Sequence, residues 1–262
     1  QEINLLTSAI ARMNMFMHGI EEFDIVRGDT LANPGLIKND ELKKFNVILA
    51  NPPYSIKSWD RKSFESDPFG RNLWGTPPQG CADYAFQQHI QKSLDVENGR
   101  SISLWPHGIL FRDAEADMRR KMLEEDLVEC VIGLGPNLFY NSPMEACLLI
   151  TKTNKEKRKK GEILIINAIQ DVRQDKNISY LEPNHIEKIY NAYKAYKDEE
   201  GYCKVVSIQD VLSHKASLNM ALYVSNVDTS KEKVSLNEAL STLETSSRNL
   251  VMSMDQLFRE LS

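Results

Sequence analysis

The chain has 262 residues, of which 42% are hydrophobic and 26% charged, with a formal net charge of -5. These values are ordinary for a globular protein and exclude a collagen-like, coiled-coil or largely disordered chain, while the acidic balance argues against a free-standing DNA-binding protein. No segment approaches the roughly 18 consecutive apolar residues of a membrane span and the N-terminus has no signal-peptide pattern, so we expect a cytoplasmic protein with no membrane contact.

The first half of the chain alternates helical and strand patterns. Apolar residues at helical spacing predict a helix over 5–19 that ends at a glycine. Two short β-branched segments follow at 23–31 and 45–54, and each ends in turn residues, as parallel strands often do. Residues 55–80 are rich in Ser, Gly and Pro and predict a long loop, after which the helical pattern resumes at 82–94.

The second half continues with strands that lie closer together. Residues 99–110 predict a strand that breaks at its proline and glycine, 113–126 a charged helix, and 127–134 a buried strand. Two more strands are expected at 144–153 and 161–169. Alternating strands and helices predict an α/β fold with a doubly wound sheet, and the consecutive strands leave an antiparallel pairing of the last strands open.

The composition changes after residue 172, which suggests three parts. A main domain covers 1–172, a capping or linking segment covers 173–234, and a terminal helix covers 235–262. This last helix has an apolar seam that something must cover, either its own domain or a partner subunit. The seam comprises Leu236, Leu240, Leu243, Leu250, Met254, Leu257 and Leu261.

The tetrapeptide NPPY directly follows the strand at 45–50 and is the strongest chemical signal in the chain. The amide oxygen of Asn51 and the carbonyl of Pro52 can accept both hydrogens of an aromatic amine, and Tyr54 offers a flat face to an extruded base. We therefore expect Asn51, Pro52 and Tyr54 to be catalytic in the transfer of a methyl group from a sulfonium to an amine, without a general base. The alternative is a rigid turn capped by asparagine.

Further motifs add a family resemblance. QEIN, ARMNMFMHG, GDTL, ANPPYS, WPHGILFR, PNLFYNS and LNMALYV follow one another between residue 1 and about residue 223. In this order the chain resembles the modification subunits of type I restriction-modification systems, which are adenine-N6 DNA methyltransferases. The resemblance implies a Rossmann-like S-adenosylmethionine-dependent methyltransferase sheet in 1–172, followed by a helical C-terminal tail.

One expected motif is missing from this sequence. The family has a glycine-rich turn that wraps the methionine part of the cofactor, and no F-x-G-x-G or D-P-x-x-G-x-G pattern occurs here. We therefore expect the catalytic domain to be incomplete. The first strand, the glycine-rich turn and an N-terminal helical region would belong to an upstream part.

The resemblance also implies a set of residues that bind S-adenosylmethionine. Glu2 matches the acidic residue that binds the ribose hydroxyls, and Asp29 matches the residue that binds the adenine of the cofactor. Asp83 and Phe86 match the segment that lines the cofactor pocket, which Asn51 borders. The alternatives are a surface glutamate, a turn aspartate, and helix-terminal charge with core packing.

The flipped base has its own implied residues. Tyr54 on one side and Phe139 or Tyr140 on the other would hold it, although packing of Phe139 onto the sheet is an equal alternative. The family usually has proline where this chain has Gly135. We interpret His107 as structural or lining the cleft. The four cysteines lie far apart without C-x-x-C spacing, so we expect neither disulfides nor a metal site.

The resemblance finally implies partners. The substrate is an adenine in DNA, a separate specificity subunit reads the sequence, and a restriction subunit cleaves, with two modification subunits in the complex. Other readings remain open, because NPPY also serves methyltransferases of protein glutamine, and cytosine-N4 methylation uses similar chemistry. A non-catalytic scaffold is a further alternative, favoured by the missing glycine-rich turn.

Overall fold

The computed structural model describes residues 1–139, 143–175, 178–224 and 236–261. They belong to two compact units, Gln1–Ser225 and Asn226–Ser262, each of which is described by itself. Within the described ranges, no helix combines the length and the apolar character needed to cross a membrane.

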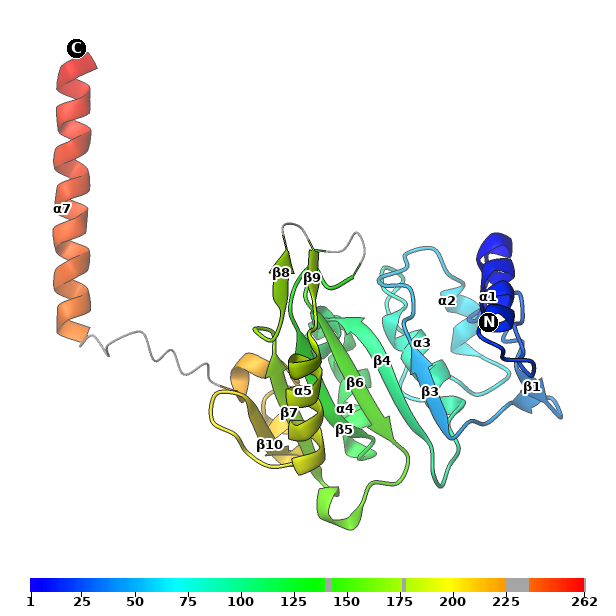
Figure 1. Ribbon diagram of the computed structural model, residues 1–262. Helices are drawn as coiled ribbons and strands as arrows, with labels where there is room; N and C mark the ends of the chain where they lie inside the picture. The colour runs from blue at the N-terminus through cyan, green and yellow to red at the C-terminus, as the bar shows by residue number, and fades with distance from the viewer. Residues whose placement is uncertain (140–142, 176–177, 225–235, 262) are drawn as a thin grey trace. The chain divides into compact units, whose positions relative to one another are not determined.

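A six-stranded mixed sheet forms the centre of the first unit, with the strand order β10-β7-β5-β6-β4-β3 (Figure 1). The α/β fold expected from the sequence is confirmed. The strands are β3 (Val47–Ala50), β4 (Arg100–Pro106), β5 (Val128–Leu134), β6 (Ala146–Lys152), β7 (Glu162–Ala168) and β10 (Cys203–Ser207).

Strand direction decides where the functional loops gather. β3 is parallel to β4, and β5 is parallel to β7, whereas β6 runs antiparallel to both β4 and β5. β3, β4, β5 and β7 therefore point the same way, and the loops after them leave from one edge of the sheet. β10 is antiparallel to β7, so β7 has a parallel neighbour in β5 and an antiparallel neighbour in β10.

Helices cover both faces of this sheet. On one face α3 (Asp83–Lys92), α4 (Ala116–Glu124) and α6 (Ile208–Ser213) share a core with the central strands, which includes Trp105 and Val131. On the other face α5 (Pro183–Ala195) packs with a second apolar cluster (Figure 1). Amphipathic helices on a sheet buried on both faces explain the nearly continuous apolar strands β5 and β7.

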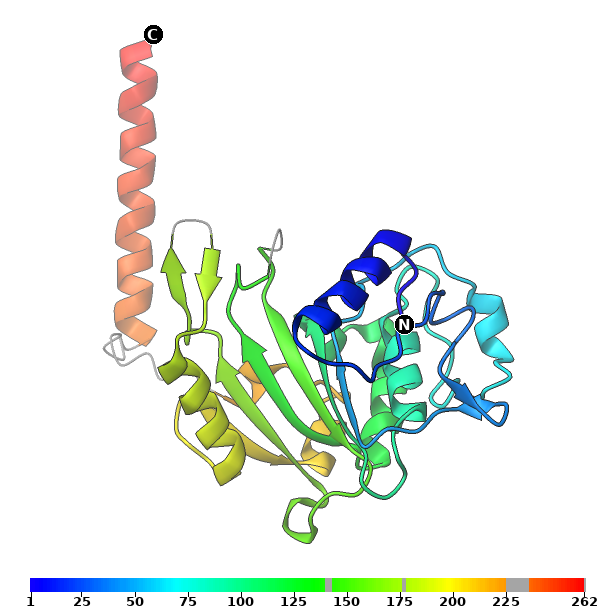
Figure 2. The same ribbon diagram turned by 45° about the vertical axis from the view of Figure 1, so that its right-hand side comes forward.

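Shorter elements surround the sheet. α1 (Leu5–Met17) is capped by Asn4, whose side chain accepts a hydrogen bond from the Thr7 backbone N–H, and it lies with α2 (Arg61–Glu65) on the β3 side (Figure 2). β1 (Ile37–Lys38) pairs with β2 (Glu41–Leu42), and β8 (Arg173–Asp175) with β9 (Ile178–Tyr180). The 3₁₀ turns are His107–Leu110, Asp113–Glu115, Lys157–Lys159 and Met220–Leu222.

Two expectations from the sequence differ from the structure. The strand expected at 23–31 was wrong, because that segment forms only an isolated parallel bridge between Glu2 and Arg27. The segment after 172 is more than a cap, because β10 extends the main sheet and Val211, Leu218 and Met220 lie in its core. The compact unit consequently extends well past residue 172.

In the second unit, the described residues 236–261 form one long helix, α7 (Leu236–Leu261), as the sequence predicted. Along its described part, the seam residues Leu240, Leu243, Leu250 and Met254 are all exposed by about half or more, from 48% to 63%. The side chains of Leu236, Leu257 and Leu261 lie outside the described residues.

Candidate functional site

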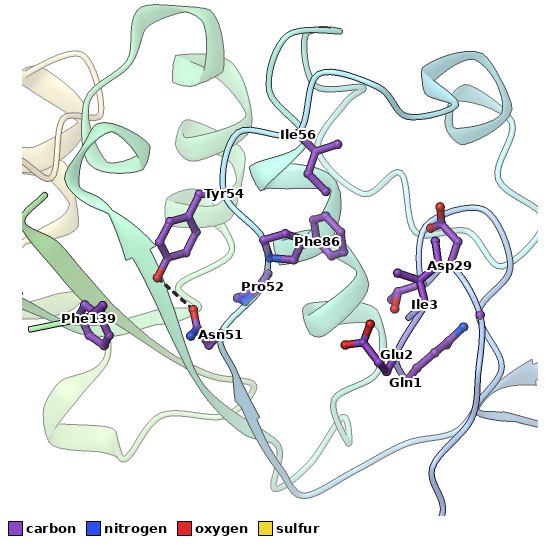
Figure 3. Close-up of a pocket in the computed structure, with 13 residues that line it drawn as sticks. Gln1, Glu2, Ile3, Asp29, Asn51, Pro52, Tyr54, Ile56, Phe86 and Phe139 are labelled. Atoms are coloured by element: carbon purple, nitrogen blue, oxygen red, sulfur yellow. Dashed lines mark hydrogen bonds between the residues drawn. The ribbon is translucent and has the colours of Figure 1, made fainter. Parts of the chain in front are cut away.

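A pocket of about 630 Å³ opens where the chain leaves the carboxyl end of β3 (Figure 3). This volume suits a cofactor-sized molecule. Its lining comes from the N-terminus, the turn at 28–30, the NPPY segment, α3 and the loop after β5. The lining residues are Gln1, Glu2, Ile3, Gly28, Asp29, Thr30, Asn51, Pro52, Pro53, Tyr54, Ile56, Phe86 and Phe139.

The NPPY segment forms one end of this pocket. The Tyr54 hydroxyl donates a hydrogen bond of 2.9 Å to the Asn51 amide oxygen, and Phe139 lies on the same side (Figure 3). Burial raises the pKa of Tyr54 to about 12, so the hydroxyl stays a donor at neutral pH. An amide oxygen has two lone pairs, which leaves Asn51 able to accept a second hydrogen bond from an amine.

Two carboxylates occupy the other end. Glu2 is held beside residues 26–28, because its backbone N–H donates to Val26 and its carbonyl accepts from Gly28, both at 3.0 Å. Asp29 caps the next turn and accepts hydrogen bonds from the backbone N–H groups of Leu31 at 2.8 Å and Ala32 at 3.1 Å. Glu2 and Asp29 both line the pocket, so the structure brings these expected cofactor residues together.

A buried arginine supports the Asp29 turn from behind. The guanidinium of Arg71 donates to the carbonyls of Thr30 at 2.8 Å and Leu31 at 2.7 Å, and it pairs with Asp67 at 2.6 Å. Arg71 is only 2% exposed. The sequence reading missed it because nothing in the loop at 55–80 marked one charged residue as different from the others.

Apolar side chains separate the two ends. Phe86 of α3 lies between them with Pro52 and Ile56 (Figure 3). Phe86 was expected here. Ile56 was missed, although its place two residues after the motif was a usable signal.

Three other expected residues do not line the described pocket. Asp83 does not line the pocket; it is fully buried behind the NPPY loop, and its carboxylate oxygens are bonded to the Ser55 backbone and to Arg112. Tyr140 lies outside the described residues. His107 does not line the pocket either, because its ring binds the Ala146 carbonyl at 2.8 Å, which agrees with a structural role.

One cluster has the residue types of a metal site. Ligand atoms of Cys81, Asp83 and Glu115 lie within 4.8 Å of one another. The Arg112 guanidinium, however, binds both carboxylates, at 2.5 Å and 2.7 Å. Burial also raises the pKa of the Cys81 thiol to about 12, which disfavours the thiolate that a metal needs. The group is therefore an ion-pair cluster.

Comparison with known proteins places this arrangement in a family. The N-6 DNA Methylase family matches residues 1–232, which is most of the chain and includes every residue of the pocket. The chain belongs to this family.

Two curated relatives show which kind of methylase the chain resembles. The methylase subunit of the type I restriction enzyme MjaVIII from Methanocaldococcus jannaschii is 33% identical over 255 residues, which cover 93% of this chain and 43% of the relative. The methylase subunit of HindI from Haemophilus influenzae is 30% identical over 253 residues, covering 93% and 55%. The chain thus spans about half the length of these curated relatives.

A solved structure agrees with them. The methyltransferase subunit of a type I restriction-modification system from Streptococcus thermophilus superposes with a TM-score of 0.78 at 33% identity, over 86% of this chain and 48% of that one. The methyltransferase fold that the resemblance implied is confirmed.

Proposed function

We propose that this chain carries the adenine-binding part of the catalytic site in a DNA adenine-N6 methyltransferase, the modification subunit of a type I restriction-modification system. The observation that carries the proposal is the NPPY segment at the carboxyl end of β3, which forms one wall of a pocket whose far end bears two carboxylates. The names of the relatives, which are methylase subunits of type I restriction enzymes, support it.

The pocket fits S-adenosylmethionine at the positions that this chain supplies. The Glu2 carboxylate suits the ribose diol, Asp29 suits the amino group of the cofactor adenine, and Phe86 offers an apolar surface to the ring. When bound, this cofactor supplies an electrophilic methyl group on a sulfonium.

The residues of the chain then act on the amine. The amide oxygen of Asn51 and the carbonyl of Pro52 accept its two hydrogens and hold the nitrogen lone pair toward the cofactor end of the pocket. Pro52 and Pro53 have no N–H, and their fixed φ angles keep these acceptors in place. The two oxygens would stabilise the positive charge that develops on the amine as the N–C bond forms and the S–C bond of the sulfonium breaks, and the proton would then leave to solvent.

The adenine reaches this position only outside the duplex. Tyr54 provides a stacking surface beside Asn51, and Phe139 lies on the same side of the pocket. Aromatic stacking offsets part of the cost of unpairing a base. Phe139 is half-buried and also packs against the sheet, so its two expected roles are compatible.

Partners follow from the proposed function. The net charge of -5 leaves sequence recognition and much of the attraction to DNA to other subunits, for which we propose a specificity subunit, a restriction subunit and a second modification subunit in the cytoplasm. We propose the apolar seam of α7 as a contact with such a subunit, because its side chains are exposed.

An Asn51→Ala variant tests the function. In the complete methylating complex, incorporation of labelled methyl groups into DNA should fall by about 100-fold or more, as for removal of one electrostatic contact to the transition state. Asn98→Ala, at an exposed loop position, serves as the control and should methylate normally.

The modified product separates the alternatives. Mass analysis should find N6-methyladenine, whereas N4-methylcytosine would replace the adenine reading with the cytosine one. Labelling of a translation release factor in place of DNA would assign the site to protein glutamine. Full methylation by Asn51→Ala would remove this asparagine from the mechanism, and no methylation by the unmodified complex would instead favour the non-catalytic scaffold.

A further inference from the structure

A polar network with two fully buried carboxylates lies directly behind the NPPY loop. It consists of Ser55, Asp83, Arg112 and Glu115, and we call it the Ser55 network. The Ser55 backbone N–H donates to one carboxylate oxygen of Asp83 at 2.6 Å, and Arg112 donates to the other at 2.5 Å. The same guanidinium binds Glu115 at 2.7 Å and 3.1 Å.

The Ser55 backbone needs such support. Its φ angle is +51°, in the left-handed region, which costs a residue with a side chain on the order of 1–2 kcal/mol. This residue directly follows Tyr54, so its backbone sets the direction in which the loop leaves the stacking tyrosine. A hydrogen bond to an ionised carboxylate is about twice as strong as a neutral one and can offset that cost.

The guanidinium keeps this carboxylate in place. The side chains of Asp83 and Glu115 are both 0% exposed, and Arg112 is the cation between them. Burial raises the pKa of Glu115, and the Arg112 pairing opposes that rise. Without the cation, two buried carboxyl groups would face each other, and a proton or a displaced side chain would have to relieve their repulsion.

The network joins three elements that the sequence separates. Ser55 follows β3, Asp83 begins α3, and Arg112 follows the turn after β4, where its backbone N–H bonds the Gly108 carbonyl at 2.9 Å. Gly108 also leaves room for the guanidinium, since a Cβ there would lie 3.2 Å from the nearer terminal nitrogen. The segment after β4 is therefore linked through Asp83 to the loop that follows β3.

We infer that Arg112, acting through Asp83 on the strained Ser55 backbone, is a positioning residue that holds the NPPY loop in the conformation needed for methyl transfer. This inference rests on the proposed function. Arg112 does not line the pocket, so the network acts on the rate of transfer rather than on binding of DNA or cofactor.

The first variants are Arg112→Gln and Arg112→Lys in the complete methylating complex. For Arg112→Gln, kcat should fall about 10- to 100-fold, the range expected for a displaced reacting group, while KM for DNA and cofactor changes less than about threefold. Arg112→Lys keeps the positive charge but cannot bind both carboxylates in the same geometry, so its kcat should lie between those of Arg112→Gln and the unmodified complex. If Arg112→Gln does not fold, the kcat of Arg112→Lys tests the inference, provided that the Tm of this variant is unchanged.

Rescue distinguishes positioning from general destabilisation. Adding Ser55→Gly to Arg112→Gln removes the left-handed penalty, and kcat should recover at least about fivefold. Lys159→Gln is the matched control, because it breaks the buried Lys159–Glu129 pair of 2.8 Å at the opposite end of the sheet. It should lower Tm and leave kcat unchanged.

Two results would overturn the inference while leaving the function intact. One is normal kcat in both Arg112 variants alongside an inactive Asn51→Ala. The other is a loss of kcat that Ser55→Gly fails to rescue and that Lys159→Gln reproduces. An active Asn51→Ala would instead overturn the proposed function itself.

Discussion

Replacing Tyr54 separates the two tasks assigned to it, because the hydroxyl and the ring can be removed one at a time. Tyr54→Phe keeps the stacking surface and loses only the 2.9 Å hydrogen bond to the Asn51 amide oxygen. A bond of this kind contributes about 0.5–1.5 kcal/mol net, which corresponds to roughly a 2- to 12-fold lower kcat/KM. Tyr54→Ala also loses base stacking of about 1–3 kcal/mol, a further loss of roughly 5- to 150-fold.

Steady-state methylation of an oligonucleotide measures both variants. A duplex with 2-aminopurine at the target position reports extrusion of the base, because its fluorescence rises when it leaves the stack. Tyr54→Phe should keep that signal and Tyr54→Ala should reduce it. Equal losses in the two variants would refute a separate stacking role, and normal rates in both would remove Tyr54 from the site.

Two further predictions concern other parts of the chain. Burial, with a smaller contribution from Arg71, lowers the pKa of His89 from 6.5 to about 4. The unfolded chain therefore binds a proton that the folded chain does not as pH falls through that window, and stability should drop by about 1–2 kcal/mol between pH 7 and 5. Denaturant melts at the two pH values check this, and a His89→Gln variant with an undiminished drop would contradict it. On α7, replacing Leu243 and Leu250 by serine should weaken co-purification with a partner subunit at least tenfold. Thr245→Lys, on the opposite face of the helix, should leave co-purification unchanged. If the double serine variant still co-purifies fully, the seam is not the contact.

The sequence predicted the fold well where the local pattern of apolar residues determines the secondary structure. The periodic apolar positions of α1, α4, β5 and α7 place each element within a few residues of its observed bounds. It failed at 23–31, where a strand needs a neighbour and the structure offers only the bridge to Glu2. It also failed to place β10, because pairing with β7 depends on contacts that no local pattern encodes.

The site shows the same difference between features that are local in the sequence and features that depend on contacts between distant segments. NPPY could be found because its chemistry is local, and the resemblance identified Glu2, Asp29 and Phe86, which the structure places in the pocket wall. Asp83 was identified as a relevant residue but placed in the cofactor wall, since the sequence cannot show that Arg112 and Ser55 approach its carboxylate from different elements.

Gly135, the departure from the family pattern, also has a local reason. A Cβ there would lie 2.5 Å from the Ile169 carbonyl oxygen and 2.8 Å from a methyl group of Val172. The segment after β7 therefore comes too close for a larger residue in this arrangement. Both views show that the β8–β9 hairpin rises from this same edge of the sheet (Figure 1, Figure 2).

The antiparallel insertion of β6 between β4 and β5 limits how the aromatic side of the pocket can respond to a base. β5 ends at Leu134 and the adjacent strand β6 begins at Ala146, so the strands on both sides of Phe139 in the chain belong to the middle of the sheet. Closing such a short segment costs little chain entropy. On the proposed function, a nucleobase would then be held and released by a local rearrangement of this segment, with the layers of the sheet and helices left in place.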